Sequence, residues 1–511
     1  MLAQSSCRRP AGDGRRTGET RRSSHMAESP DLRRQPLAPL RPFALPRLHD
    51  DAALDGYLEA ALGILERTGV RVLSERALAV FAEHGATAEL HTGVVRLPAD
   101  LVRGALASAP RTFVLGSRDG SCDLDLASGD TFMTTDGSDV EVIDWRSGER
   151  RATTKADLAD ATRVQDYLGS IGFWWPTVAA GDCGRTAQLH ELEVAWNGTV
   201  KHAQGMVQGQ REARVAVEMA RVVAGGEGEL RRRPPLSDLI SVVSPLTIDR
   251  DGADAALVFA EAGVPVAVVS WPACGTTAPA TAAGATAQGL AEVAAMATLL
   301  QLAHPGAPVI GYLLVVTTDP RTGAIVTCPF GDRDPTLVVD LVHRLGLPCL
   351  AAFAGTDDER TGTWRAAAES SHSLMTAAWS GAELTVGLGG TNGSILWSFT
   401  ELLLDDHLYH QARYAVSAIP TDDERLALDV IHAVGPGGHF LGHSHTRRHL
   451  REEFRRGLTL VAADAGGYRD AVEVARERAI EILEHYVPEG LEADKAAALR
   501  ELVAAADADL G

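Results

Sequence analysis

Long hydrophobic runs are absent from the 511-residue sequence. No stretch of eighteen consecutive apolar residues occurs, so no segment is long and apolar enough to cross a bilayer as a helix. Aromatic residues make up only 5% of the chain, whereas Gly occurs 50 times. The core must therefore be built mainly from Ala, Val and Leu. These features predict a protein with no membrane association and a cytoplasmic location.

Cysteine is also scarce, and its spacing excludes the usual cysteine motifs. None of the six residues forms a C-x-x-C pair. Such scatter in a long chain argues against a disulfide framework and for a reducing compartment. A catalytic cysteine is an alternative, but a small buried hydrophobic residue is the commoner role. The six are Cys7, Cys122, Cys183, Cys274, Cys328 and Cys349.

Positive charge is deficient everywhere except at the N-terminus. The net charge is −20, while residues 1–48 hold ten Arg against four acidic residues. The acidic body excludes a nucleic-acid partner, because it would repel a polyanion. The Arg-, Pro-, Ser- and Gly-rich tail is predicted to be disordered. No apolar segment follows Arg8-Arg9, which argues against an export signal, and translation could begin at Met1 or at Met26.

A regular rhythm between about residues 130 and 420 predicts an α/β fold, a (β/α)8 TIM barrel. Apolar segments such as "VPVAVVS" suit parallel strands that are covered on both faces. A doubly wound open sheet is the alternative, but "TTDGSDVE" lacks the glycine fingerprint expected after its first strand. Strands are predicted to start near Phe132, Ile171, Ala203, Leu239, Val266, Val309, Cys349 and Leu384. Helices are predicted over 155–168, 185–198, 209–224, 252–262, 283–303, 333–346, 363–381 and 398–415.

Helical segments flank this barrel on both sides. We expect a disordered basic tail over 1–48, an N-terminal helical region with short strands over 49–128, the barrel over 129–420 and a C-terminal helical region over 421–511. In the N-terminal region, Ser74 is predicted to cap the helix that begins "ERALAVF". The C-terminal region reads as amphipathic helices.

Functional groups in such a barrel gather at the carboxyl ends of the strands. The predicted ends contain no nucleophile elbow, paired carboxylates or phosphate-binding loop, so no catalytic residue is assigned. They contain aromatic and small polar groups, including three of the eight Trp residues. Aromatic faces suit a quaternary ammonium ion, although the same rings could simply pack in the core. The candidate substrate-binding residues are Asp136, Trp174, Trp175, Met206, Gln208, Trp271 and Phe353.

The segment "HAVGPGGHFLGHSHTRRH" holds five histidines in eighteen residues. No carboxylate or third His follows at helical spacing, so a metal site is the weaker interpretation and no metal is predicted. A loop folded over the barrel mouth, with one or two His facing the cavity, is the better-supported interpretation. A metal-dependent barrel enzyme that uses this His432–His449 cluster remains an alternative.

Three blocks of the sequence resemble the trimethylamine methyltransferase family. They are "ILERTGVRVLSERALAVFAEHGA", "CGTTAPATAAGATAQGLAEVAAMATLLQLAHPGAPVIGY" and "LALDVIHAVGPGGHFLGHSHTRRHLREEF". The last is similar to the family's G-P-G-G-x-F-L and H-T pattern. The resemblance covers about Leu48 to about Tyr468, and "AGTDDERTGTWRAAAE" lacks the Lys that the family leads us to expect. It implies a TIM barrel that moves a methyl group from a methylated amine to a corrinoid.

Members of the family that act on trimethylamine carry pyrrolysine, which this sequence lacks. The resemblance therefore implies the non-pyrrolysine, glycine betaine methyltransferase-like division, and a quaternary amine or betaine as substrate. The residues expected to face the corrinoid are Gly389, Gly390, Asn392, His439, His443 and His445.

The corrinoid itself is expected on a separate cognate corrinoid protein. The D-x-H-x-x-G signature of corrinoid domains begins at Asp405 but has His410 where Gly is required, so Asp405 and Asp406 are interpreted as a solvated helix face. A barrel that binds quaternary amines without catalysis is the second hypothesis for the function. A homo-oligomer is also expected, because a partner subunit often completes a barrel mouth.

Overall fold

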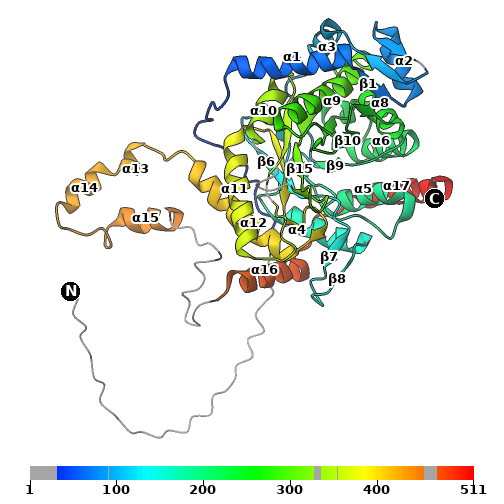
Figure 1. The fold of residues 1–511 in the computed structure, drawn as a ribbon. Coiled ribbons are helices and arrows are strands. Elements are labelled where there is room, and N and C mark those ends of the chain that lie inside the picture. The colour runs from blue at the N-terminus through cyan, green and yellow to red at the C-terminus, as the bar shows by residue number, and fades with distance from the viewer. Residues whose placement is uncertain are drawn as a thin grey trace. The chain divides into compact units, whose positions relative to one another are not determined.

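Eight parallel strands close into a barrel in the computed structural model, which describes residues 32–89, 91–326, 335–353, 355–453, 458 and 469–510 (Figure 1). Seven of these strands form one sheet in the order β6-β18-β17-β14-β12-β10-β9. The eighth, residues 171–174, pairs with β6 at Met133–Ile171 and with β9 at Trp174–Ala203. The predicted TIM barrel is therefore confirmed. The sheet strands are β6 (Phe132–Thr135), β9 (Ala203–Gly205), β10 (Leu236–Val242), β12 (Val266–Ser270), β14 (Val309–Leu313), β17 (Cys349–Ala352) and β18 (Leu384–Leu388).

A helix near each predicted position covers the outside of the barrel (Figure 1). Val and Ala side chains on the outer faces of the strands pack against these helices, which is why strands such as β12 and β14 are apolar on both faces along most of their length. The helices are α4 (Lys155–Tyr167), α5 (Ala187–Gly198), α6 (Gln210–Ala224), α8 (Arg250–Ala262), α9 (Ala282–Ala303), α10 (Pro335–Arg344), α11 (Trp364–Ser380) and α12 (Phe399–Val416).

A separate apolar cluster fills the inside of the barrel. Alternate strand residues such as Leu239, Ile310 and Leu350 point inward, together with Leu115 and Leu124 from the hairpin of β4 (Val114–Leu115) and β5 (Leu124–Asp125). The hairpin lies at the amino ends of the strands, where the Gly116 carbonyl is 3.0 Å from Nδ1 of His202, the residue before β9. This end of the barrel is therefore filled, and access to its interior is from the carboxyl ends of the strands.

The N-terminal region packs on the barrel helices. Contacts join α1 and α3 to α9, and β1 pairs with β11. Ser74 caps α2 as predicted, since its Oγ accepts the Ala77 N–H at 3.1 Å. These elements are α1 (Asp51–Arg67), β1 (Val70–Val72), α2 (Glu75–Glu83), β2 (Thr87–Glu89), β3 (Val94–Arg96), α3 (Ala99–Leu106) and β11 (Thr247–Ile248).

Shorter elements follow several of the barrel strands. A hairpin of β7 (Glu141–Ile143) and β8 (Arg150–Ala152) joins a second pair, β19 (Gly390–Thr391) and β20 (Leu396–Trp397), in a four-stranded sheet at the carboxyl end of the barrel. The others are η1 (Gly184–Thr186), α7 (Glu227–Arg232), β13 (Ala273–Cys274), β15 (Val316–Thr318) and β16 (Ile325–Val326).

The C-terminal region has two parts. The helices α16 (Ala471–His485) and α17 (Ala493–Leu510) pack on the barrel, α16 against α12 and α4, and α17 against α5 and α6. Before them, α13 (Asp423–Leu426), α14 (Leu428–Val434) and α15 (Ser444–Glu453) form a projecting segment, which we call the arm (residues 422–453; Figure 1). No residue of α13 or α14 is buried.

The predicted disordered tail of residues 1–48 is too long. Residues 1–31 lie outside the described part of the chain, but residues 32–48 run along the barrel. Leu40 is fully buried and its backbone pairs with Thr131, the residue before β6. The Tyr409 hydroxyl donates to the Ala38 carbonyl at 2.7 Å. One buried Leu and a series of backbone hydrogen bonds hold the segment, although its composition is typical of disorder.

None of the described helices combines the length and the apolar character needed to cross a membrane. The described cysteines Cys122, Cys274 and Cys349 are buried, while Cys183 is half-buried.

Replacing Leu40 by Ala should lower the free energy of unfolding by about 2–5 kcal/mol, because the change leaves a cavity in a packed site. Urea unfolding followed by circular dichroism measures this. The matched control is Leu45→Ala, since Leu45 is 56% exposed and its truncation should shift the midpoint little. Equal effects of the two variants would show that residues 32–48 are not packed on the barrel.

Candidate functional site

The two neighbouring tryptophans at the end of the eighth strand point to opposite sides of the barrel wall. Phe173 and Trp175 belong to the cluster inside the barrel, whereas Trp174 belongs to the outer core. Successive strand residues alternate between faces, so adjacent rings cannot share one cavity. The Trp174 indole donates to the Thr162 hydroxyl of α4 at 2.9 Å. The prediction that Trp174 lines the substrate cavity is wrong, and its role is packing.

Trp175 lies inside the barrel near its carboxyl end, which we call the mouth. Its backbone is fixed by Gln165, whose amide donates to the Trp175 carbonyl at 3.1 Å. The indole Nε1 is buried and has no hydrogen-bond partner among the described residues. A Cβ added to Gly137 would lie 1.3 Å from this nitrogen. Gly137 is therefore needed to make room for the indole.

Asp136 follows β6 directly and lies beside this ring. Its Oδ1 accepts the Gly137 N–H at 3.0 Å. Its Oδ2 lies against Gly390, where an added Cβ would come within 2.0 Å. Burial raises the pKa of Asp136, and a hydrogen bond from the Ser394 hydroxyl partly offsets this. Asp136 is thus placed at the mouth as predicted, and the glycines around it leave space for its carboxyl group.

Three loops meet around Asp136 and form one rim. The Thr356 N–H donates to the Gly390 carbonyl at 3.1 Å, and the Asn392 N–H donates to the Asp358 carbonyl at 3.0 Å. The Ser138 N–H donates to the Pro176 carbonyl at 2.6 Å. These bonds tie the loops after β17 and β18 together and tie the loop after β6 to residue 176. Asn392 has a positive φ of 53°, which suits a tight turn in this rim.

A second carboxyl group, Asp139, is buried in the same loop. It is fully buried, and neither of its oxygens has a hydrogen-bond partner among the described residues. Burial, with a smaller contribution from the charge of Asp136, raises its pKa well above the usual value. A buried carboxyl group without partners is costly. Sequence reasoning missed Asp139 because nothing in its spacing distinguishes it from a surface loop residue.

The remaining predicted substrate residues divide into two groups. Met206 packs against the inner cluster, and its Sδ lies 3.2 Å from the Ser138 hydroxyl. Trp271, just after β12, is 45% exposed at the carboxyl end. Phe353 is buried in the outer core, so its predicted place in the cavity is wrong for the same reason as for Trp174. Gln208 lines a separate polar hollow beside the C-terminus of α17 rather than the mouth.

Tyr312 of β14 is an inner residue that the sequence analysis did not select. It belongs to the same inner cluster as Trp175 and is almost fully buried. The signal was present in "VIGYLLV", where Ile310, Tyr312 and Leu314 occupy alternate positions and share one face of the strand.

Gly389 faces a barrel helix rather than an open cavity. Its N–H donates to Oδ2 of Asp405 on α12 at 2.8 Å, and an added Cβ would meet the Trp397 ring at 2.7 Å. Close packing of helix and strand therefore explains this glycine. Asp405 is fully buried, which corrects the expectation of a solvated face. Burial raises the pKa values of both Asp405 and Glu401; the charge of Asp405 adds to the rise at Glu401, and the charges of Asp136 and Asp406 add to the rise at Asp405.

The histidine-rich segment lies in the arm and does not cover the mouth. The arm follows the C-terminal end of α12, where the Phe43 N–H donates to the Val416 carbonyl at 2.9 Å. A barrel helix runs antiparallel to its strands, so this end lies at the amino ends of the strands, opposite the mouth. His439 is exposed. The prediction that these histidines face the cavity of their own barrel is therefore wrong.

Two histidines of the arm, His445 and His449, lie against each other beside Glu424, with ring centroids 4.4 Å apart. Nδ1 of His443 accepts the His445 N–H at 3.2 Å, and Nε2 of His445 lies 3.0 Å from the Glu424 carbonyl. Among the described residues, no group of three or more His, Cys, Asp or Glu side chains is arranged to hold a metal ion. The geometry of His439, His443 and His445 therefore gives no support to the metal-dependent alternative.

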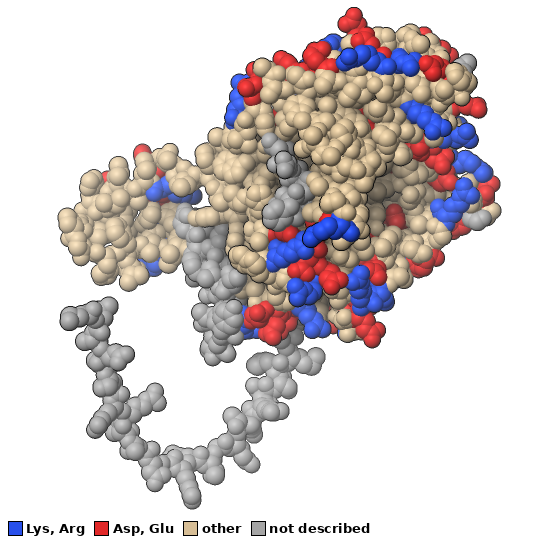
Figure 2. Space-filling view, in the orientation of Figure 1, with Lys and Arg blue, Asp and Glu red and all other residues tan. Residues whose placement is uncertain are grey.

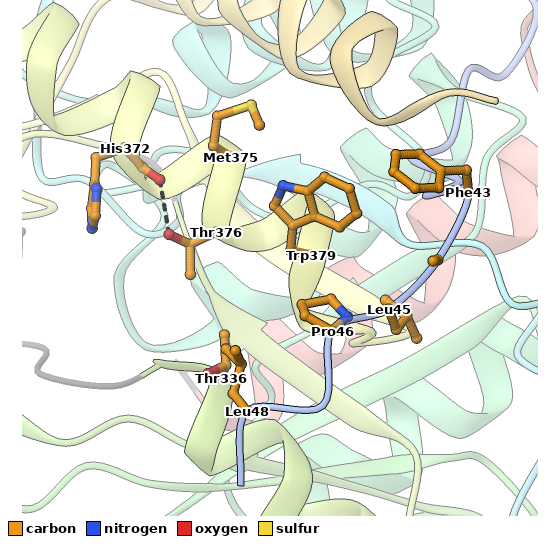
Figure 3. Close-up of a pocket in the computed structure, with 10 residues that line it drawn as sticks. Phe43, Leu45, Pro46, Leu48, Thr336, His372, Met375, Thr376 and Trp379 are labelled. Atoms are coloured by element: carbon orange, nitrogen blue, oxygen red, sulfur yellow. Dashed lines mark hydrogen bonds between the residues drawn. The ribbon is translucent and has the colours of Figure 1, made fainter. Parts of the chain in front are cut away.

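An apolar hollow of about 530 Å³ lies outside the helical layer (Figure 3). Phe43 and Trp379 meet there edge to face, with ring centroids 5.4 Å apart. The other lining residues come from α10, α11 and the segment before α1. None of the described residues that line this hollow is a carboxylate, whereas the mouth combines the Trp175 indole with the carboxyl groups of Asp136 and Asp139. The mouth is therefore the candidate site.

Known proteins are similar over most of this chain. The sequence profile of the family described as "Trimethylamine methyltransferase (MTTB)" matches residues 12–511. The chain is 33% identical over 470 residues to "Trimethylamine methyltransferase MttB" of Desulfitobacterium hafniense strain DCB-2, which covers 90% of this chain and 94% of that protein. It is 28% identical over 467 residues to "Glycine betaine methyltransferase" of Desulfitobacterium hafniense strain Y51, with coverage of 89% and 95%. Among solved structures, the monomethylamine methyltransferase of Methanosarcina barkeri aligns over 88% of each chain at 11% identity, with a TM-score of 0.48.

Replacing Gly137 by Ala should lower the free energy of unfolding by about 1–3 kcal/mol, because the new methyl group overlaps the Trp175 indole. In a Trp175→Leu background the same change should cost much less, since the overlapping ring is gone. Urea unfolding of the four proteins of this cycle gives the coupling energy. Gly104→Ala is the control, because a Cβ at Gly104 meets nothing within 4 Å. Additive effects would contradict the contact.

Proposed function

Because the chain belongs to the trimethylamine methyltransferase family, we propose that it moves a methyl group from a methylated ammonium compound to the Co(I) corrinoid of a separate protein. The chain is thus a methyltransferase. The observation that carries the proposal is the pair of Trp175 and Asp136 at the mouth of a barrel whose other end is filled. An indole and a carboxylate side by side suit an alkylated ammonium group.

The chemistry of this reaction needs little from the protein. Co(I) attacks the methyl carbon, the C–N bond breaks, and its electron pair stays on nitrogen. A quaternary ammonium therefore leaves as a neutral tertiary amine that needs no proton. A site without an assigned general acid is sufficient for this step.

Trp175 and Asp136 are expected to orient and select the substrate rather than accelerate the reaction. The positive charge on nitrogen falls as the C–N bond breaks, so contacts with the cation favour the bound substrate over the transition state. The rate enhancement would then come from holding cobalt, carbon and nitrogen in line.

The corrinoid is a second substrate, which we expect to arrive on a cognate protein that docks at the mouth. Large apolar side chains are exposed in the segments that follow six barrel strands, all at the carboxyl end of the barrel, and a contiguous apolar surface is typical of protein interaction sites. They are Val140, Val243, Trp271, Ile325, Trp364 and Ile395.

Association of two copies of the chain stays a prediction. The arm carries exposed apolar side chains, among them Ile431 and Leu441, and Figure 2 shows mostly uncharged side chains over it. No described residue of α13 or α14 is buried within the chain.

Trp175→Leu should raise KM for the methylated amine roughly tenfold and lower kcat/KM by a smaller factor, since a cation–π contact contributes about 1–2 kcal/mol and weakens as the charge on nitrogen falls. Formation of methyl-Co(III), followed spectroscopically with a Co(I) corrinoid protein and a panel of N-methyl compounds, measures this. The control is Trp174→Phe, because Trp174 faces α4, and its activity should stay near that of the unchanged protein. Binding without any methyl transfer would favour the alternative, a non-catalytic barrel that binds quaternary amines.

Trp364→Asp should raise the KM for the corrinoid protein about tenfold and leave amine binding unchanged, because exposed Trp residues often dominate protein interfaces. Trp364 is 87% exposed at the start of α11, where an acidic residue is compatible with the helix dipole. Steady-state kinetics with varied corrinoid protein tests this. Val487→Asp is the control, since Val487 is 83% exposed after α16. An unchanged KM for the corrinoid protein would remove this loop from the docking surface.

A further inference from the structure

We propose that the substrate of this barrel carries net positive charge, as an ammonium without a carboxylate group, and that Asp136 is the residue that selects for it. The inference deepens the proposed function and rests on it. It separates simple alkylammonium cations from betaines, in which a carboxylate balances the ammonium charge.

The buried and half-buried charged groups near the mouth are carboxyl groups. Asp139 is fully buried and Asp136 is half-buried in the loop after β6, and Glu401 and Asp405 are buried on α12, with Asp405 directly behind Gly389. Arg360 and Arg365 lie in the loop after β17 and at the start of α11, but both are largely exposed and pair with Asp358 and Glu369. A substrate that enters here meets carboxyl groups before it meets any buried cation.

Within the described ranges, Lys201 is the one Lys or Arg residue that is fully buried. Its Nζ donates to the carbonyl oxygens of Gln165 and Leu168 at 2.6 and 2.8 Å. These carbonyls end α4, so Lys201 lies at the amino ends of the strands. It is too far from the mouth, and too fully bonded, to receive a substrate carboxylate.

The geometry places Asp136 where an ammonium group beside Trp175 would lie. Gly137 lies between the two side chains. Its N–H donates to the Asp136 carboxylate, and its Cα lies against the Trp175 indole, where a Cβ would overlap the ring. The carboxylate is held from two sides, by this N–H and by the Ser394 hydroxyl. Such anchoring fixes a negative charge in place before the substrate arrives, which favours selectivity.

Asp139 adds a second observation that points to a cation. Both of its oxygens are buried without a hydrogen-bond partner among the described residues, which is unfavourable in the protein without ligand. A bound cation nearby would stabilise negative charge in this loop. A betaine would bring its own carboxylate to the same place, and two or three like charges in a region of low dielectric repel each other strongly.

Isothermal titration calorimetry with the full chain tests the inference. The probes are tetramethylammonium and choline as cations, glycine betaine as the zwitterion, and 3,3-dimethylbutan-1-ol as the neutral isostere of choline. We expect both cations to bind at least about tenfold more tightly than glycine betaine, a ratio typical of one well-placed charge contact.

Asp136→Asn should weaken binding of the two cations about tenfold or more and leave binding of the neutral isostere unchanged. Glu359→Gln is the matched control, because it removes the same charge from a side chain that is 65% exposed near the rim. It should leave all four affinities unchanged. Urea unfolding of both variants confirms that each is folded.

The pH dependence gives a readout that a merely structural role would not produce. Tetramethylammonium carries no proton, so any change of its affinity comes from the protein. The charge of Asp136 helps to raise the pKa values of Asp139 in the same loop and of Asp405 on α12. Burial raises the pKa of Asp136 itself. A neutral carboxyl group cannot balance the cation, so affinity should rise as pH increases through this raised pKa. Asp136→Asn should flatten the rise.

Three results of the binding experiments would overturn the inference. They are binding of glycine betaine as tight as that of the cations, an equal effect of Asp136→Asn on the cation and its neutral isostere, and no binding of either cation. Methyl transfer from glycine betaine but not from cations would also refute it, while the proposed function would stand. Selective cation binding without methyl transfer to any corrinoid protein would support the inference and refute the proposed function.

Discussion

Closure of eight parallel strands into a cylinder is the constraint on which the site depends. Once the ends of the sheet join, every strand residue must point either into the interior or out toward a helix. The hairpin of β4 and β5 fills the amino end with Leu115 and Leu124. A ligand can therefore reach the interior only from the carboxyl ends, where the loops after the strands bring Asp136 and Trp175 together.

Glycines around the mouth are a consequence of this crowding. Gly137 makes room for the Trp175 indole, and Gly390 makes room for the Asp136 carboxyl group. Neither glycine is required because of a positive φ. Each is required because a Cβ at its position would overlap a neighbouring side chain. The same residues that look like flexible loop glycines in the sequence are thus determined by packing around two functional side chains.

The mouth and the opposite end of the barrel differ in their buried charges: among the described residues, the mouth has buried carboxyl groups but no buried cation, whereas the opposite end has both Lys201 and the buried Asp166. Buried carboxyl groups gather near the carboxyl ends of the strands, while Lys201 is bound to carbonyl oxygens where α4 ends. Asp136 and Asp139 are disfavoured as anions by burial, and a bound ammonium would relieve that penalty. A ligand with net positive charge therefore offsets the cost of these carboxylates, whereas a zwitterion brings a carboxylate of its own. This difference is the physical basis for selection between cations and zwitterions.

The sequence by itself determined the barrel, because the period of its apolar residues changes between strand and helix regardless of distant contacts. It indicated the eight strand positions, the Ser74 cap and the presence of Asp136, Trp175 and Trp271 at strand ends, with β10 starting at Leu236 rather than near Leu239. It could not separate Trp174 from Trp175, because which of two adjacent rings faces inward depends on the register of the closed sheet. Only the tertiary structure placed the histidines of the arm opposite the mouth, buried Leu40 and Asp405, and revealed Asp139, since each of these depends on segments that are far apart in the chain.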